Sequence, residues 1–244
     1  MKIWPKSIFS SVGFPISIAR SQHDLTKVGH LRYELYVDRD KKAYAFADHR
    51  GRALIEPVDA ASLNFYSSDA SGVCSAVRLT GAEDASEDPL LAALLESARI
   101  RHMTRVVTCS RFAVQPTLAA RKTIMPLFRE VCRAGLKAGA VKCLLATRPS
   151  LVGIFAKFGF RSANRTFVDR VAGELSVCEF DLHDLQHLVS ISSPVVDVIF
   201  DHFSTARKQH ARSTANAMFT HVTENDDAAA PGVLDTSDRH LQRT

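Results

Sequence analysis

An apolar stretch at residues 104–114 carries two polar side chains in its middle, Ser110 and Arg111. The stretch has the length and composition of a buried strand. Alternation along a strand predicts that Ser110 and Phe112 point to one face and Arg111 to the other. Burying an unpaired guanidinium is costly, so Arg111 requires a carboxylate, a cluster of carbonyls or a ligand. A structural ion pair and a role in substrate binding are both open.

Two carboxylates and two further arginines are candidates for the same chemistry. Glu56 and Asp59 lie three positions apart in a predicted loop, where they are either solvated acids or ion-pair partners of Arg111. Arg32 falls on or beside the apolar face of a predicted helix, where it binds a ligand or extends to solvent. Arg78 ends a predicted strand and either pairs with a carboxylate or binds substrate.

The cysteines and histidines give no reason to expect other chemistry. The five cysteines are odd in number and lack CxxC spacing, which predicts reduced core thiols in a cytoplasmic protein. Cys109 has no histidine nearby in sequence to activate it, so we expect a buried thiol and not a nucleophile. The ten histidines form no HExxH or HxH pattern, and we expect no metal.

Composition restricts the possible partners. The chain has 244 residues and a net charge of +5, enough for one domain of about 200 residues with tails. The mild basic excess suits an acidic partner. The sequence contains no run of Lys/Arg interleaved with aromatic residues, so we do not expect a nucleic-acid partner. No apolar run approaches the ~20 residues of an integral membrane segment, and Pro5 and Pro15 argue against a signal peptide.

Periodicity and turn residues predict the elements that must position these side chains. Predicted strands cover 14–19, 62–69, 73–80, 104–114, 141–147, 165–171 and 175–181. Predicted helices cover 23–37, 87–99, 117–138, 150–159, 183–190 and 194–206. Strand and helix alternate from 104 to 160, which predicts a mixed α/β sheet.

Details of two helices can also be predicted. Thr117 is a predicted N-cap, and Pro126 should kink the following helix or shift its start. Gly159 fits a left-handed helix end.

The predicted domain organisation has three parts. Residues 1–14 form a lead-in, and residues 15–208 form the domain, with a helical extension from about 183. Residues 209–244 are polar and alanine-rich, which predicts disorder.

Several short motifs resemble those of known acyltransferases. The strand Ser110-Arg111-Phe112-Ala113-Val114 resembles the SRF-type strand of LuxI-type acyl-homoserine-lactone synthases and of FeeM-type N-acyl amino acid synthases, both within the GNAT acyltransferase superfamily. The other matching segments are Leu31–Val37, Glu56–Asp59, Arg78-Leu79 and Phe155–Arg161. They occur in the family's order and cover about residues 15–162.

The resemblance implies a fold and a site. The fold is a GNAT-like mixed sheet, flanked by helices, whose central strands splay to admit the pantetheine arm of an acyl donor. Glu56 and Asp59 are implied catalytic carboxylates that take a proton from the amine, and N–H groups of the splayed or bulged strand are implied to stabilise an oxyanion. The implied substrate-binding residues are Arg32, Tyr36, Arg78, Ser110, Arg111 and Phe112. Val114 and Arg121 are implied to lie beside the donor's phosphopantetheine.

The chain departs from the families that it resembles at three points. Coenzyme A-dependent GNAT enzymes carry a glycine-rich turn for the diphosphate, whereas residues 115–121 contain no glycine. This favours acyl-carrier protein, with its single phosphodiester, as donor, and acyl-coenzyme A is the other possibility. Thr108 or Cys109 stands where lactone synthases have a glutamate. The tryptophan that lactone synthases carry in their first loop also has no counterpart, because the only tryptophan is Trp4. These departures favour an amino acid acceptor.

The predicted function is therefore that of a cytoplasmic bacterial acyltransferase with no tightly bound cofactor. It would move a fatty acyl chain from acyl-carrier protein to the amino group of a small acceptor, an amino acid in the first instance. The alternatives are an acyl-homoserine-lactone synthase using S-adenosylmethionine, a coenzyme A-dependent N-acetyltransferase, and a GNAT-like binding module without activity.

Overall fold

The computed structural model describes residues 15–207, so the predicted lead-in 1–14 and tail 209–244 lie outside the described residues. Contacts group Met1–His202 into one compact unit and Phe203–Thr244 into a second. The described part of the first unit contains the whole sheet and every candidate site residue.

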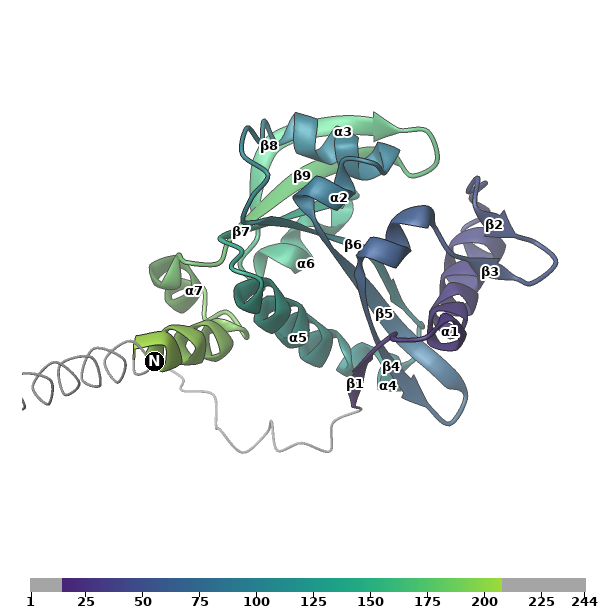
Figure 1. Ribbon diagram of the computed structural model, residues 1–244, viewed down its shortest axis with the longest axis horizontal. Helices are drawn as coiled ribbons and strands as arrows, with labels where there is room; N and C mark the ends of the chain where they lie inside the picture. Colours follow the sequence, from purple (N-terminus) through teal and green to yellow (C-terminus); the bar gives the residue numbers. More distant parts are fainter. Residues whose placement is uncertain (1–14, 208–244) are drawn as a thin grey trace, which may run out of the picture. The chain divides into compact units, whose positions relative to one another are not determined.

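The first unit is built on a seven-stranded sheet of order β1-β4-β5-β6-β7-β9-β8 (Figure 1). Neighbouring strands are antiparallel except β6 and β7, which are parallel, so the sheet is mixed as predicted. The strands are β1 (Ile16–Ile18), β4 (Leu63–Asp69), β5 (Gly72–Gly81), β6 (Val106–Val114), β7 (Lys142–Thr147), β8 (Arg161–Asp169) and β9 (Gly173–Asp181). The short strands β2 (Ala47–Asp48) and β3 (Ala53–Leu54) pair separately.

Helices cover both faces of this sheet. They are α1 (Gln22–Arg32), the π-helix η2 (Tyr33–Arg39), the 3-10 helices η3 (Pro57–Ala61) and η4 (Pro149–Leu151), α2 (Ala82–Ala85), α3 (Pro89–Ser97), α4 (Leu118–Lys122), α5 (Ile124–Lys137), α6 (Val152–Ala156) and α7 (Leu185–Ser190). A further helix begins at Val196. Within residues 15–207, no helix combines the length and apolar character that crossing a bilayer requires.

The side chains of β5 show which helices cover which face. Ala76 packs in a core cluster with Val28 and Leu31 of α1. Leu79, an odd number of residues away, lies instead beside Phe128 of α5. Helices α1 and α5 therefore cover opposite faces, as Figure 1 shows, and α3 packs against β7 and β8.

Several predicted elements differ from the observed ones. The predicted helix 117–138 is two helices, because the Thr123 hydroxyl bonds to the Ala120 carbonyl at 2.6 Å and to Ser75 Oγ at 2.5 Å. Pro126 is the third residue of α5, and N–H groups in the first turn of a helix have no partner within the helix. Of the two outcomes expected for this proline, a kink or a shifted helix start, the structure shows the shifted start. The predicted loop 38–60 contains β2, β3 and the start of η3, and β8 begins four residues before its predicted start.

A β-bulge in β6 reorients the side chains of the central strand. Ala113 pairs with Ala76 and Ser110 with Arg78, so two residues of β6 oppose one residue of β5. Arg111 is one of these two and has a φ of 51°. The prediction that Phe112 shares the face of Ser110 is therefore wrong, because the bulge interrupts the alternation.

The ring of Phe112 consequently lies on the α5 face. It packs against Phe128 and Phe155, with ring centroids 5.3 Å and 6.1 Å away. Ser110 and Arg111 both reach the α1 face, where they contact Arg78 and Glu56 respectively.

The parallel pairing of β6 with β7 stops half-way along both strands. The last paired residues are Cys109 and Leu145, whereas β6 continues to Val114 and β7 to Thr147. The central strands therefore separate beyond this pair, as the predicted splayed sheet requires.

Candidate functional site

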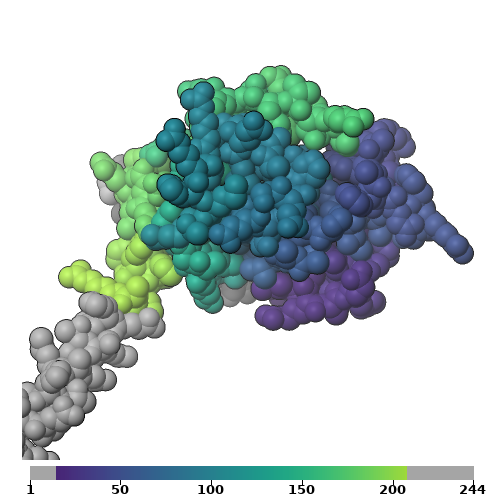
Figure 2. Space-filling view, turned by 45° about the horizontal axis from the view of Figure 1, so that its top comes forward, coloured from purple at the N-terminus to yellow at the C-terminus, as the bar shows by residue number. Residues whose placement is uncertain are grey.

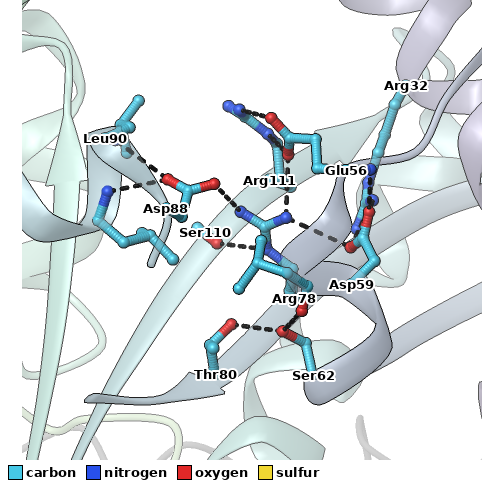
Figure 3. Close-up of polar contacts among 12 residues, drawn as sticks. Arg32, Glu56, Asp59, Ser62, Arg78, Thr80, Asp88, Leu90, Ser110 and Arg111 are labelled. Atoms are coloured by element: carbon cyan, nitrogen blue, oxygen red, sulfur yellow. Dashed lines mark hydrogen bonds and ion pairs between the residues drawn. The ribbon is translucent and has the colours of Figure 1, made fainter. Parts of the chain in front are cut away.

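A network of buried ion pairs lies on the α1 face of β5 and β6 (Figure 3). It joins three arginines to three carboxylates, namely Arg32, Arg78, Arg111, Glu56, Asp59 and Asp88. Equal numbers of opposite charges explain how so many ionised groups are tolerated in the interior. The network includes every charged residue that the sequence predicted for the site except Arg121.

The first part of the network fixes the end of α1. Nη1 of Arg32 donates to both carboxylate oxygens of Asp59 at 2.9 Å, and Nη2 donates to Oδ1 of Asn64 at 2.6 Å. Asp59 also accepts the backbone N–H of Glu56 at 2.8 Å, across one turn of η3. The three-residue spacing of the acids is therefore the spacing of a helical turn, and it holds both side chains in one place.

Arg78 connects both acids to the central strand. Its Nη1 donates to Glu56 at 2.9 Å and to Asp59 at 3.3 Å, and its Nε donates to the Ser110 hydroxyl at 3.0 Å. Its Nη2 lies 3.8 Å from Asp88, which caps α3 through the Leu90 and Leu91 amides. Arg78 is 0% exposed, so this strand-end arginine is a central member of the network.

Arg111 connects the network to Tyr44, in the loop after η2. Its Nε donates to Oε2 of Glu56 at 2.6 Å and its Nη2 to Oε1. Its guanidinium carbon lies 4.7 Å from the centroid of the Tyr44 ring, a cation–π distance. Both the ion pair and the ring therefore hold the guanidinium in one orientation.

The electrostatics of the site favour an ionised Glu56 and a neutral Tyr36. Burial alone would raise the pKa of Glu56, but hydrogen bonds from Arg111 and the charges of Arg78 and Arg32 outweigh it and lower the pKa to about 2. Burial raises the pKa of Tyr36 to about 12, so its hydroxyl stays protonated. Burial also raises the pKa of the Cys109 thiol to about 12, so this cysteine is unsuited to nucleophilic chemistry.

A cavity of about 160 Å³ opens where β6 and β7 separate. Four of the predicted site residues line it: Tyr36, Ser110, Arg111 and Phe112. Other lining residues are Asp40, Lys42 and Tyr44 after η2, Thr147 at the end of β7, and Arg148 directly after it. Arg32, Arg78, Glu56 and Asp59 are absent from the cavity wall, and only Arg111 belongs to both the network and the wall.

The two residues predicted for the donor phosphate lie apart from this cavity. Val114 is the last residue of β6, and Arg121 is an exposed residue of α4. Thr117 caps α4 as predicted, through the Ala120 amide at 3.1 Å.

Sequence reasoning did not identify several residues of the site. Asp88 carried a recognisable signal, because an aspartate directly before Pro89 is a typical helix start. Lys42 and Tyr44 carried none, because they lie in an irregular segment without periodicity. Asn64 is identified only by the pairing of β4, which brings it to Arg32.

The strand β6 lines the cavity along the part where its pairing with β7 has ended. Beyond Cys109 it has no strand partner on the side of β7 among the described residues. A bulged strand next to a cavity is a common source of N–H groups for an oxyanion. Within residues 15–207, no group of three His, Cys, Asp or Glu side chains is arranged to hold a metal ion.

Known structures share this fold. TofI, in a ternary complex with an inhibitor and MTA, matches with a TM-score of 0.56 and 19% identity, over 75% of this chain and 98% of that chain. FeeM, an N-acyl amino acid synthase from uncultured soil microbes, matches with a TM-score of 0.56 and 14% identity, over 72% and 97%. BjaI, a coenzyme A-dependent acyl-homoserine lactone synthase, matches with a TM-score of 0.53 and 13% identity, over 73% and 90%.

The sequence itself matches one family. No curated protein matches the chain significantly. The model of the N-acyl amino acid synthase FeeM family matches residues 27–175, which include the ion-pair network, the bulged strand and the cavity. The chain therefore belongs to the FeeM family of N-acyl amino acid synthases, and it is an acyltransferase.

Proposed function

We propose that the enzyme transfers a fatty acyl group from acyl-carrier protein to the amino group of an amino acid. The observation that carries this proposal is the cavity between β6 and β7. Polar side chains reach it from the network and the loop after η2, and the bulged backbone of β6 borders it. An amine on the α1 face and a thioester entering between the strands can meet there.

The reaction requires one new bond and one broken bond. The amine nitrogen attacks the thioester carbonyl carbon, and the carbonyl oxygen becomes an oxyanion. We assign the stabilisation of this charge to N–H groups of β6 at the bulge. When the intermediate collapses, the C–S bond breaks, and the departing thiolate takes up the proton that the amine loses. The products are an N-acyl amino acid and the carrier's free thiol.

The residues divide into those that touch substrate and those that position them. We assign substrate contact to Tyr36, Ser110, Arg111 and Phe112, because they line the cavity. The sequence predicted Glu56 and Asp59 as groups that accept a proton. A carboxylate with a pKa of about 2 is a weak base at neutral pH, and neither acid lines the cavity. We therefore assign both acids, with Arg32 and Arg78, to positioning Arg111 and Ser110.

The choice of donor rests on the segment after β6. Residues 115–121 contain no glycine that would let a backbone wrap a diphosphate. The exposed guanidinium of Arg121, in the helix that follows β6, is available to a single phosphodiester. The net charge of +5 also complements an acidic carrier protein.

The test is an assay of the purified chain with defined donors and acceptors. Decanoyl-acyl-carrier protein and decanoyl-coenzyme A are each incubated with the enzyme and a mixture of amino acids, and products are identified by mass spectrometry. N-decanoyl amino acids formed from the carrier protein support the proposal. Formation from coenzyme A alone overturns the donor assignment, and a decanoyl lactone formed only with S-adenosylmethionine overturns the acceptor assignment. No acyl product under any condition overturns both.

A further inference from the structure

Lys42 extends from the loop after η2 to the turn between β8 and β9. Its ammonium donates to the carbonyls of Val171 at 3.3 Å and Ala172 at 3.2 Å. Figure 2 shows the blue surface of residues 40–60 beside the green surface of this hairpin. Lys42 also lines the cavity, together with Ala172. The ammonium is therefore held at a fixed place in the cavity wall.

The carboxylates around the cavity form no direct ion pair with Lys42 among the described residues. Arg111 is paired with Glu56, and Arg148 is 3.3 Å from Asp40. Among the described residues, no carboxylate lies within 4.0 Å of the Lys42 ammonium. The cavity wall therefore carries one ammonium that makes no direct ion pair with a described carboxylate, which leaves it available to an entering anionic group.

The surroundings of Lys42 make an incoming anion favourable. Burial lowers the pKa of its ammonium, and the charges of Arg148 and Arg111 lower it further, while Asp40 and Asp169 raise it. A carboxylate in the cavity would restore the stability of the charged form. Two of the three ammonium protons are used by carbonyls, so one remains for such a ligand.

We propose that Lys42 binds the carboxylate of the acceptor and so makes the enzyme select amino acids over amines of the same side chain. The inference rests on the proposed function, because it names the group that recognises the acceptor. The same charge would also suit the phosphate of a donor's pantetheine arm. The acceptor is favoured because Lys42 and Arg111 both line the cavity, whereas Val114 and Arg121, which were predicted to lie beside the donor's phosphopantetheine, do not.

The experiment uses a donor without phosphate, the decanoyl thioester of N-acetylcysteamine. The acceptors are matched pairs, L-tyrosine with tyramine and L-leucine with 3-methylbutylamine. We expect the wild type to prefer each amino acid. We expect Lys42→Met to lower kcat/KM for the amino acids by about 10- to 100-fold, mainly through KM, and to leave the amines unchanged. Lys42→Arg should restore part of the preference.

The control is Lys41→Met, which removes the same charge from the neighbouring exposed residue that does not line the cavity. If Lys42→Met lowers kcat/KM equally for the amino acids and for the matched amines, Lys42 only holds the loop in place, and the proposal is overturned. Unchanged acceptor selectivity with weaker use of decanoyl-phosphopantetheine would assign the anion to the donor, and would also overturn it.

A binding measurement separates this inference from the proposed function. Calorimetry compares N-decanoyl-L-tyrosine with N-decanoyl-tyramine, and needs no turnover. Tighter binding of the acid that is lost in Lys42→Met supports the inference. It does so even if the enzyme acylates no acceptor, although such a lack of acylation would overturn the proposed function. Equal binding of both compounds to the wild type overturns the inference.

Discussion

Arg111 and Glu56 form a two-point ion pair across 55 positions of the chain, with Nε donating to Oε2 at 2.6 Å and Nη2 donating to Oε1. The carboxylate belongs to the buried network and is only 7% exposed, whereas the guanidinium lines the cavity. The orientation of a group in the cavity is therefore set by an acid outside it.

Replacing Glu56 by Gln should leave the shape of the site and remove the charge that holds Arg111. Breaking one partner of a buried pair typically costs about 3–5 kcal/mol of stability. We expect a lower free energy of unfolding in urea and a kcat at least about 10-fold lower, because a loosely held guanidinium no longer orients the substrates. Glu83→Gln, which changes an exposed glutamate, should have the wild-type stability and kcat. Wild-type kcat in Glu56→Gln would refute the positioning role.

The same acid predicts how stability changes with pH. The pKa of Glu56 is about 2 in the folded protein, below its ordinary value of 4.5. A lowered pKa contributes stability above the unfolded value, and this contribution is lost as pH falls through the folded value. The free energy of unfolding should therefore fall by a few kcal/mol between about pH 4.5 and pH 2, and less steeply in Glu56→Gln. Parallel pH profiles for the two proteins would show that Glu56 is not selectively stabilised as a carboxylate.

The backbone at Arg111 can be tested separately from its guanidinium. A φ of 51° is unfavourable for a residue with a Cβ by about 1–2 kcal/mol, but not for glycine. Arg111→Gly should therefore be more stable than Arg111→Ala by about 1 kcal/mol, although both lose the ion pair. At Ser110, which lacks this conformation, the order should reverse, with Ser110→Ala the more stable variant. Urea denaturation of the four variants measures both differences.

Local patterns in the sequence predicted the elements better than the site. Strand 104–114, the cap at Thr117 and the turn at Gly159 follow from apolar runs and turn residues, which act over a few neighbours. The bulge was not predictable, because an arginine in the left-handed region carries no signal of its own, and the face of Phe112 was wrong for that reason. The pairing of Arg111 with Glu56 was one open option, and only the tertiary fold selects it.

The glycine that ends the α6 segment should tolerate no side chain. Gly159 has a φ of 125°, and a Cβ there would lie 2.5 Å from Leu188 and 2.9 Å from Phe180. We expect Gly159→Ala to lower the melting temperature by several degrees, in line with ~1–3 kcal/mol for overpacking plus backbone strain. Gly153→Ala is the matched control, because nothing lies within 4 Å and its φ is not positive, so it should be neutral or stabilising. Equal melting temperatures for both variants would contradict the close contact at Gly159.

Tyr44 should act on Arg111 through its ring and not through its hydroxyl. The ring lies 4.7 Å from the guanidinium carbon, and burial raises the pKa of the hydroxyl. Tyr44→Phe should therefore keep nearly the wild-type kcat/KM. Tyr44→Leu should lower it by about 3- to 30-fold, which corresponds to a cation–π contact of about 0.5–2 kcal/mol. A double-mutant cycle on the free energy of unfolding gives the coupling directly, since Tyr44→Leu should cost less in an Arg111→Met background. Additive effects of the two substitutions would mean that the ring does not position Arg111, and that Glu56 alone sets its orientation.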